Sequence, residues 1–171
     1  MDLHPLFVHF PIALLTLYSL LEVIKVFTKN SHWVTVRAVL VITGAIGAFM
    51  SLSTGEGAEH QFHGVGELRR ILEVHSLMGV VTTWIYAILA ACYVLYWLET
   101  HTALLGSPHE KLAKPVAIAR RIAERILGSV LAPMLAALGF LTLGLTGALG
   151  AMLVYGPDFD FITQLVYKLL F

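Results

Sequence analysis

The sequence contains little charge and only one cysteine. Of its 171 residues, 13% are charged and 58% are hydrophobic, whereas soluble domains are typically about a quarter charged. This composition excludes an ordinary soluble domain. The 11 basic and 11 acidic residues balance, so we expect no nucleic-acid binding through a basic surface. With Cys92 as the single cysteine, a disulfide within the chain and a thiolate metal cluster are excluded, and we expect a packing role for it.

Several catalytic signatures are missing as well. The sequence has no Gly-x-Ser-x-Gly and no His-Glu-x-x-His motif, which argues against the hydrolases that use them. It also lacks the Cys-x-x-Cys-His motif that attaches haem covalently. An electron carrier or redox subunit is therefore favoured over a stand-alone enzyme, although the sequence leaves enzymatic activity open.

The apolar residues are gathered in blocks long enough to cross a bilayer, for which about 20 residues suffice. We expect transmembrane helices at about 5–27, 34–52, 67–98 and 126–155. Apolar positions at helical spacing over residues 158–171 predict a short C-terminal interfacial helix. The predicted fold is all-α: a single transmembrane domain over residues 1–171, built as a four-helix bundle.

Basic residues predict the orientation, because cytoplasmic loops carry an excess of Lys and Arg. Eight of them lie on the side of the first-second and third-fourth loops, against three on the other side. Residues 99–125 form a basic cytoplasmic segment whose second part suits a helix on the membrane surface. We therefore expect a multi-pass protein of the cell inner membrane with both termini in the periplasm.

Histidines gather at the outer ends of the predicted helices. Five of the eight lie there, namely His4, His9, His60, His63 and His75. His9 and His75 lie at comparable depth in the first and third spans, where ionisable side chains are costly and usually functional. Two imidazoles from different helices can supply both axial ligands of a haem, so we predict that His9 and His75 bind haem iron. For the other three, a turn or a solvated loop is the simpler interpretation.

Two carboxylates flank the same outer region. Together with the histidines, Glu56 and Glu59 suit a zinc or copper site to which His4, His60 and His63 are further candidate ligands. They equally suit proton carriers near a quinone pocket, or plain loop charges. Metal binding is therefore kept as the alternative to haem.

Small residues line several helix faces near the histidines. Gly79 lies one turn beyond His75 on the same helical face, and the small-residue stripes of the second and fourth spans include Gly47 and Gly147. Such stripes let a flat macrocycle approach the backbone, although ordinary helix packing is their commoner role. With His9 and His75 they predict a haem b pocket inside the bundle, and they also permit a homodimer.

The opening motif resembles a known family. Residues 4–12, His-Pro-Leu-Phe-Val-His-Phe-Pro-Ile, are similar to the opening signature of the bacterial membrane family catalogued as domain of unknown function 2231. Thr54-Gly55, His75 and the segment 147–156 with Leu153-Val154-Tyr155 also resemble it, so the resemblance extends over all four helices. Some relatives are joined to Rieske-type iron–sulfur or c-type cytochrome modules, which implies an electron-transfer setting. This chain has neither module, so its redox role would rest on a histidine-bound cofactor and on an electron partner in another polypeptide.

Three functions follow from these patterns. The first is a b-type cytochrome-like protein that exchanges electrons with a quinone or a periplasmic redox protein. The second is a zinc- or copper-binding membrane protein, and the third is a non-catalytic membrane subunit or scaffold whose histidines only satisfy helix ends. We expect core or lipid-interface roles for the aromatic residues Trp84, Tyr86 and Tyr93. No row of polar residues is expected to cross the membrane, since the second and fourth spans read as almost purely apolar inside.

Overall fold

The four predicted spans all form long helices. A computed structural model describes residues 4–28, 33–60, 65–100 and 110–171; within these, the side chains of 4–7, 58–60, 99–100 and 110–113 are left aside. The helices described are α1 (His4–Thr28), α2 (Val34–His60), α3 (Glu67–Thr100), α5 (Glu110–Gly128), α6 (Leu131–Tyr155) and α7 (Phe161–Leu170). Four of them, α1, α2, α3 and α6, are long and apolar enough to cross a membrane. The all-α membrane fold is thus confirmed.

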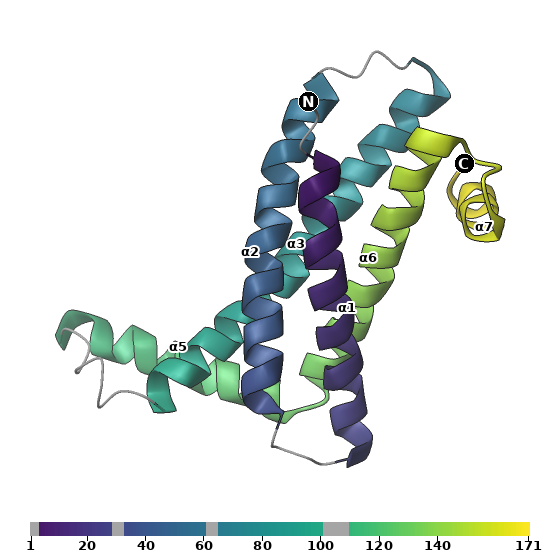
Figure 1. The fold of residues 1–171 in the computed structure, drawn as a ribbon. Helices are drawn as coiled ribbons and strands as arrows, with labels where there is room; N and C mark the ends of the chain where they lie inside the picture. Colours follow the sequence, from purple (N-terminus) through teal and green to yellow (C-terminus); the bar gives the residue numbers. More distant parts are fainter. Residues whose placement is uncertain (1–3, 29–32, 61–64, 101–109) are drawn as a thin grey trace.

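The four long helices stand side by side as an up-and-down bundle (Figure 1). Each of α1 and α3 packs against both α2 and α6, so α1 and α3 face each other across the bundle axis. Aromatic and small residues fill the core between them, including Tyr18, Val41, Tyr86 and Ala136. Large apolar side chains point outward along the spans, as lipid contact requires.

Glycines allow two of the helix pairs to approach closely. A Cβ atom on Gly139 of α6 would lie 2.8 Å from Cζ of Tyr86 on α3. A Cβ atom on Gly47 of α2 would lie 3.1 Å from Cβ of Pro11 on α1. These contacts leave little space for larger residues and set the spacing of α3 against α6 and of α1 against α2.

The helix boundaries differ from the predicted ones at two places. The helix α2 runs to His60, eight residues beyond the predicted end at 52, and therefore carries the polar segment with Thr54 and Glu56. The fourth span begins at Leu131 and not at 126, because residues 126–128 complete α5 and Ser129 Oγ accepts the backbone N–H of Leu131. This start places Pro133 in the first turn of α6, where its missing N–H costs nothing.

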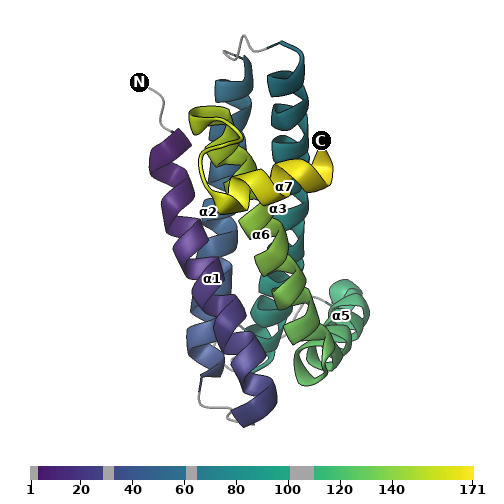
Figure 2. The ribbon, with the colours of Figure 1, turned by 90° about the vertical axis from the view of Figure 1, so that its right-hand side faces the viewer.

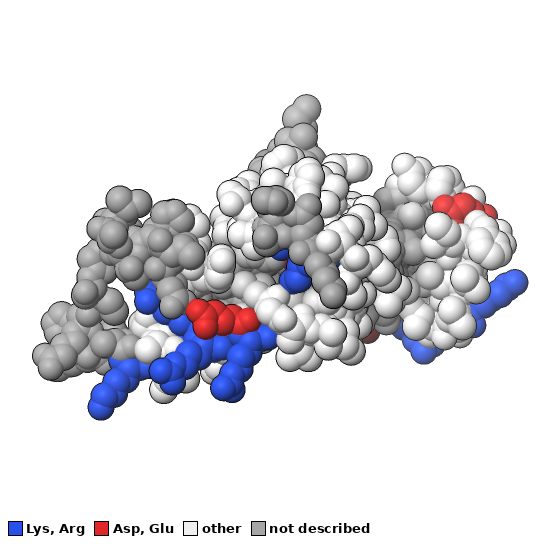
Figure 3. Space-filling model, turned by 90° about the horizontal axis from the view of Figure 1, so that it is seen from below, with Lys and Arg blue, Asp and Glu red and all other residues white. Residues whose placement is uncertain are grey.

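The basic segment forms an amphipathic helix, α5, which leaves the bundle at the end where α1 finishes (Figure 1). Seen from that end, Lys and Arg side chains gather along α5 (Figure 3). Lys114, Arg121 and Arg125 are exposed, whereas Ala123 is buried. This arrangement is the one expected of a basic helix at a membrane surface.

The short C-terminal helix α7 lies across the opposite end of the bundle, against α3 and α6 (Figure 2). It begins at Phe161 because Asp160 caps it: its carboxylate accepts the N–H of Thr163, while the Thr163 hydroxyl accepts the N–H of Asp160. The Thr163 backbone N–H also holds the pKa of the Asp160 carboxyl below its ordinary value. Val166 packs into the cluster of Ile71, Leu149 and Met152, which anchors α7 to the bundle.

Candidate functional site

The imidazole of His75 lies between α3 and α6, toward the end of the bundle where α3 begins and α6 finishes. Its Nδ1 is 3.0 Å from the backbone carbonyl oxygen of Thr146 on α6. Since a carbonyl only accepts hydrogen bonds, Nδ1 is the donor of this bond. A hydrogen bond of this kind is the usual support of a metal-ligating histidine, because it fixes the tautomer and the ring orientation.

Only one of the glycines considered near His75, namely Gly150, contacts its ring. A Cβ atom on Gly150 of α6 would lie 3.2 Å from Cε1 of His75, so the ring packs directly on the α6 backbone. A Cβ atom on Gly79 would lie 3.5 Å from Leu52 and 3.9 Å from Thr146, which places Gly79 in the interior between α2 and α6. Gly47 packs on Pro11, and Gly147 is exposed with open space at its Cβ position. The glycine at the ring is therefore Gly150, whereas the sequence analysis named Gly79, Gly47 and Gly147 as candidates.

The other predicted ligands are either exposed or outside the described residues. His9 lies within the first span, Val8–Thr28, and its side chain is exposed, whereas Pro11 two residues later is buried against α2. Glu56 is also exposed. The side chains of His4, Glu59 and His60 and the whole of His63 lie outside the described residues. Within the part of the chain that the structure describes, no group of three His, Cys, Asp or Glu residues is placed to hold a metal ion.

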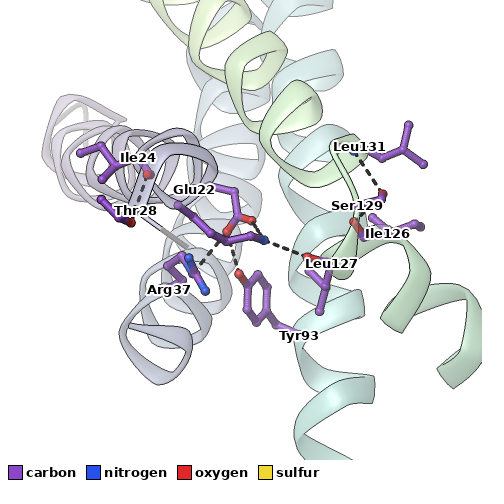
Figure 4. Close-up of polar contacts among 10 residues, drawn as sticks. Glu22, Ile24, Thr28, Arg37, Tyr93, Ile126, Leu127, Ser129 and Leu131 are labelled. Atoms are coloured by element: carbon purple, nitrogen blue, oxygen red, sulfur yellow. Dashed lines mark hydrogen bonds and ion pairs between the residues drawn. The ribbon is translucent and has the colours of Figure 1, made fainter. Parts of the chain in front are cut away.

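A second polar cluster lies toward the opposite end of the bundle, where α1 finishes and α2 begins (Figure 4). The carboxylate of Glu22 on α1 is fully buried; it pairs with Lys25, accepts the Tyr93 hydroxyl at 2.7 Å, and lies 3.4 Å from Nε of Arg37 on α2. At 3.4 Å the Arg37 contact is an ion pair without a well-formed hydrogen bond. Lys25 Nζ also donates to the carbonyl of Leu127 at 2.8 Å. Side chains of α1, α2 and α3 thus meet at one carboxylate, and Lys25 links it to the end of α5. We call Glu22, Lys25, Arg37 and Tyr93 the inner cluster.

The sequence analysis did not identify the inner cluster as a candidate site. The structure places Arg37 inside the second span, with only 3% of its surface exposed. The sequence could have indicated this cluster, because its charged residues lie within or at the ends of the membrane spans, where ionisable residues usually pair with one another.

Polar side chains also occupy the interior between the two ends. The hydroxyls of Ser19 and Tyr86 are 2.7 Å apart, and those of Thr82 and Thr146 are 3.5 Å apart. The Tyr18 ring packs edge-on against both Tyr86 and Tyr93, with centroid distances of 6.1 Å. These contacts are separate pairs, so the expectation that no row of polar residues crosses the membrane stays a prediction.

Comparison with curated proteins and with solved structures finds no match for this chain. A family model described as predicted membrane protein DUF2231 matches residues 1–107. The matched region contains α1, α2 and α3 and therefore the whole inner cluster, whereas the segment 147–156 lies beyond it. Since the match covers more than half of the sequence, the chain belongs to this family of membrane proteins with domain of unknown function 2231.

Proposed function

We propose that this membrane protein carries electrons through a haem b bound at the outer end of its bundle, with His75 as one axial ligand. The observation that supports this best is the hydrogen bond between His75 Nδ1 and the Thr146 carbonyl, because a bond of this kind fixes the ring orientation of a metal-ligating histidine. The close approach of Gly150 to the ring holds the imidazole against α6. A ligand held in this way needs no further support from a loop.

His9 is our candidate for the second axial ligand. It lies near the outer end of the first span, and its imidazole is exposed there. An imidazole exposed within a span is costly, and iron ligation would offset that cost. Two imidazole ligands leave no open position on iron, so the proposed role is electron transfer with a quinone or a periplasmic protein and not oxygen chemistry.

The absorption spectrum tests the haem proposal. Detergent-purified protein from haem-replete cells is expected to show a Soret band and, after dithionite reduction, an alpha band. His75→Ala should abolish both bands, because it removes the ligand that the helix carbonyl orients. His9→Ala should retain haem but shift its spectrum to the high-spin form.

Glu56→Gln is the matched control, because Glu56 is exposed on α2 near its outer end; its spectrum should equal that of the wild type. Colourless protein that contains zinc or copper would replace the haem proposal by the metal-binding alternative. Colourless protein without metal would support the role of a non-catalytic subunit.

We further propose that α5 lies on the cytoplasmic side of the inner membrane and both termini in the periplasm, since eight of the 11 Lys and Arg residues lie in or beside the first-second and third-fourth loops, the side to which α5 belongs. Lys114 on α5 and Lys168 on α7 are both exposed and lie at opposite ends of the bundle. In intact spheroplasts, a membrane-impermeant maleimide should label Lys168→Cys and leave Lys114→Cys unlabelled until the cells are lysed. The reverse pattern would invert the proposed orientation. Cys92 is buried, so the wild-type protein serves as the unlabelled control.

A further inference from the structure

The helix α5 carries three basic residues on its exposed side. Lys114, Arg121 and Arg125 are exposed and follow one another at intervals of seven and four residues, so they lie on one face of the helix. The opposite face, which includes the buried Ala123, packs against the bundle, mainly against α3. Figure 3 shows Lys and Arg side chains gathered along this helix. We call Lys114, Arg121 and Arg125 the basic stripe; it is about 16 Å long.

The protein's own carboxylates do not neutralise the basic stripe. Among the residues that the structure describes, no carboxylate forms a salt bridge with any of its three members. Over residues 114–128 the acidic residue is Glu124, which is exposed. Three exposed basic residues against one acidic residue leave an excess of two positive charges, so the stripe is complementary to an anionic partner.

Two exposed isoleucines run beside the basic stripe. Ile118 and Ile122 are 59% and 53% exposed and lie four residues apart, on the same side of α5. A helix with an apolar row beside a basic one suits the membrane interface, where the apolar side chains enter the acyl boundary and the basic ones reach the headgroups. The isoleucines thus favour a lipid surface over an acidic soluble protein as the partner.

The basic stripe is held in a fixed position next to the membrane. The helix α5 ends at Gly128, and the fourth span begins at Leu131. The carbonyl of Leu127 accepts a hydrogen bond from Lys25 Nζ at 2.8 Å, which ties the end of α5 to α1. Because the helix is already ordered and docked, a ligand of the stripe does not bear the cost of folding it.

From this arrangement we propose that the basic stripe binds the headgroups of anionic phospholipids, with Ile118 and Ile122 in the adjoining acyl region. The guanidinium groups of Arg121 and Arg125 match phosphate oxygens with paired N–H donors. A zwitterionic headgroup also contains a phosphate, but its own cation neutralises it, so the excess positive charge of α5 selects the anionic lipid. Each Lys or Arg close to an anionic membrane strengthens the attraction about fivefold.

The test measures which lipids surround α5 in liposomes that contain the full-length protein. Ala117→Cys, exposed on α5 and one turn from Arg121, carries a fluorophore, while Cys92 is buried and stays unlabelled. Either phosphatidylglycerol or phosphatidylcholine in the liposomes is brominated, because bromine quenches a nearby fluorophore. The two quenching curves give the relative association constant of the anionic over the zwitterionic lipid. Since both leaflets have the same composition, the orientation of the protein does not affect the result.

We expect a relative association constant of about 5 or more with the basic stripe intact. Arg121→Gln with Arg125→Gln removes the two excess charges and should bring the constant to about 1. Lys114→Gln with Arg121→Gln is a second such pair should the first reconstitute poorly. A constant of about 1 with the stripe intact would overturn the proposal, as would an unchanged constant in both double variants.

The opposite end of the bundle supplies matched controls. Arg69→Gln with Lys168→Gln lowers the net charge equally, but both residues lie far from α5, on α3 and α7, so the constant measured at α5 should stay the same. A label on Gln164→Cys of α7 should show no preference for the anionic lipid, since Asp158 and Asp160 outnumber Lys168 there. An equal preference at α7 would also overturn the proposal. Lipid binding needs no cofactor at His75, so its failure is separable from the failure of the spectroscopic test.

Discussion

Glu22→Ala is expected to destabilise the protein by about 3–5 kcal/mol, the usual cost of removing one partner from a buried ion pair. The substitution leaves the guanidinium of Arg37, which is 3% exposed, without its counter-charge inside the bundle. It also removes the acceptor of the Tyr93 hydroxyl. Lys25 is less affected, because it is partly exposed and retains the Leu127 carbonyl. The measurement is unfolding in detergent by titration with a denaturing surfactant.

Two further variants show that the loss comes from an unpaired charge. Glu73→Ala removes a carboxylate whose partner is Arg69 on an exposed helix face, and it should cost no more than about 0.5 kcal/mol. The double variant Glu22→Ala/Arg37→Met should recover much of the stability, because no buried charge is left unpaired. A Glu22→Ala protein as stable as Glu73→Ala would contradict the buried pairing in Figure 4.

Gly139→Ala is expected to destabilise the bundle by about 1–3 kcal/mol, the usual cost of overpacking. The added methyl would lie 2.8 Å from Cζ and 3.1 Å from the hydroxyl oxygen of Tyr86, a ring that is itself fully buried. The ring has no space to move into, so α3 and α6 must separate slightly. The same surfactant titration measures the effect.

Gly144→Ala on the same helix is the control. The Cβ position of Gly144 is open, with no atom within 4 Å among the described residues. Alanine is favoured over glycine in a helix by about 1 kcal/mol, so Gly144→Ala should leave stability unchanged or raise it. Equal losses in the two variants would mean that α3 and α6 do not approach at Gly139.

The fold could be predicted because its signal is long and simple. Each run of apolar residues of membrane-spanning length predicts one helix, and so does the apolar spacing of the C-terminal tail. The boundaries were less accurate. The fourth span was begun at 126 because apolar residues continue through Ile126 and Leu127, although these belong to the end of α5.

The candidate site could be predicted only in part. His75 was identified from its depth, and the structure adds the Thr146 carbonyl and Gly150 as its neighbours. These contacts depend on how α3 and α6 pack, which a single sequence does not contain. The seven-four-seven spacing of His75, Thr82, Tyr86 and Tyr93 was visible, but Tyr and Thr at helical spacing are ordinary core residues until their hydroxyls are seen to pair.

The position of Glu22 and Arg37 on consecutive helices bears on how the chain enters the bilayer during synthesis. On insertion scales, a lone acidic or basic residue at the centre of a helix costs roughly 2.5–3.5 kcal/mol. A hairpin of α1 and α2, which pack against each other, brings the two opposite charges together before any later segment has been made. The two charges can therefore enter the bilayer as a neutral pair within the α1–α2 hairpin. The helices α3 and α6 then pack against a hairpin that is already stable in lipid.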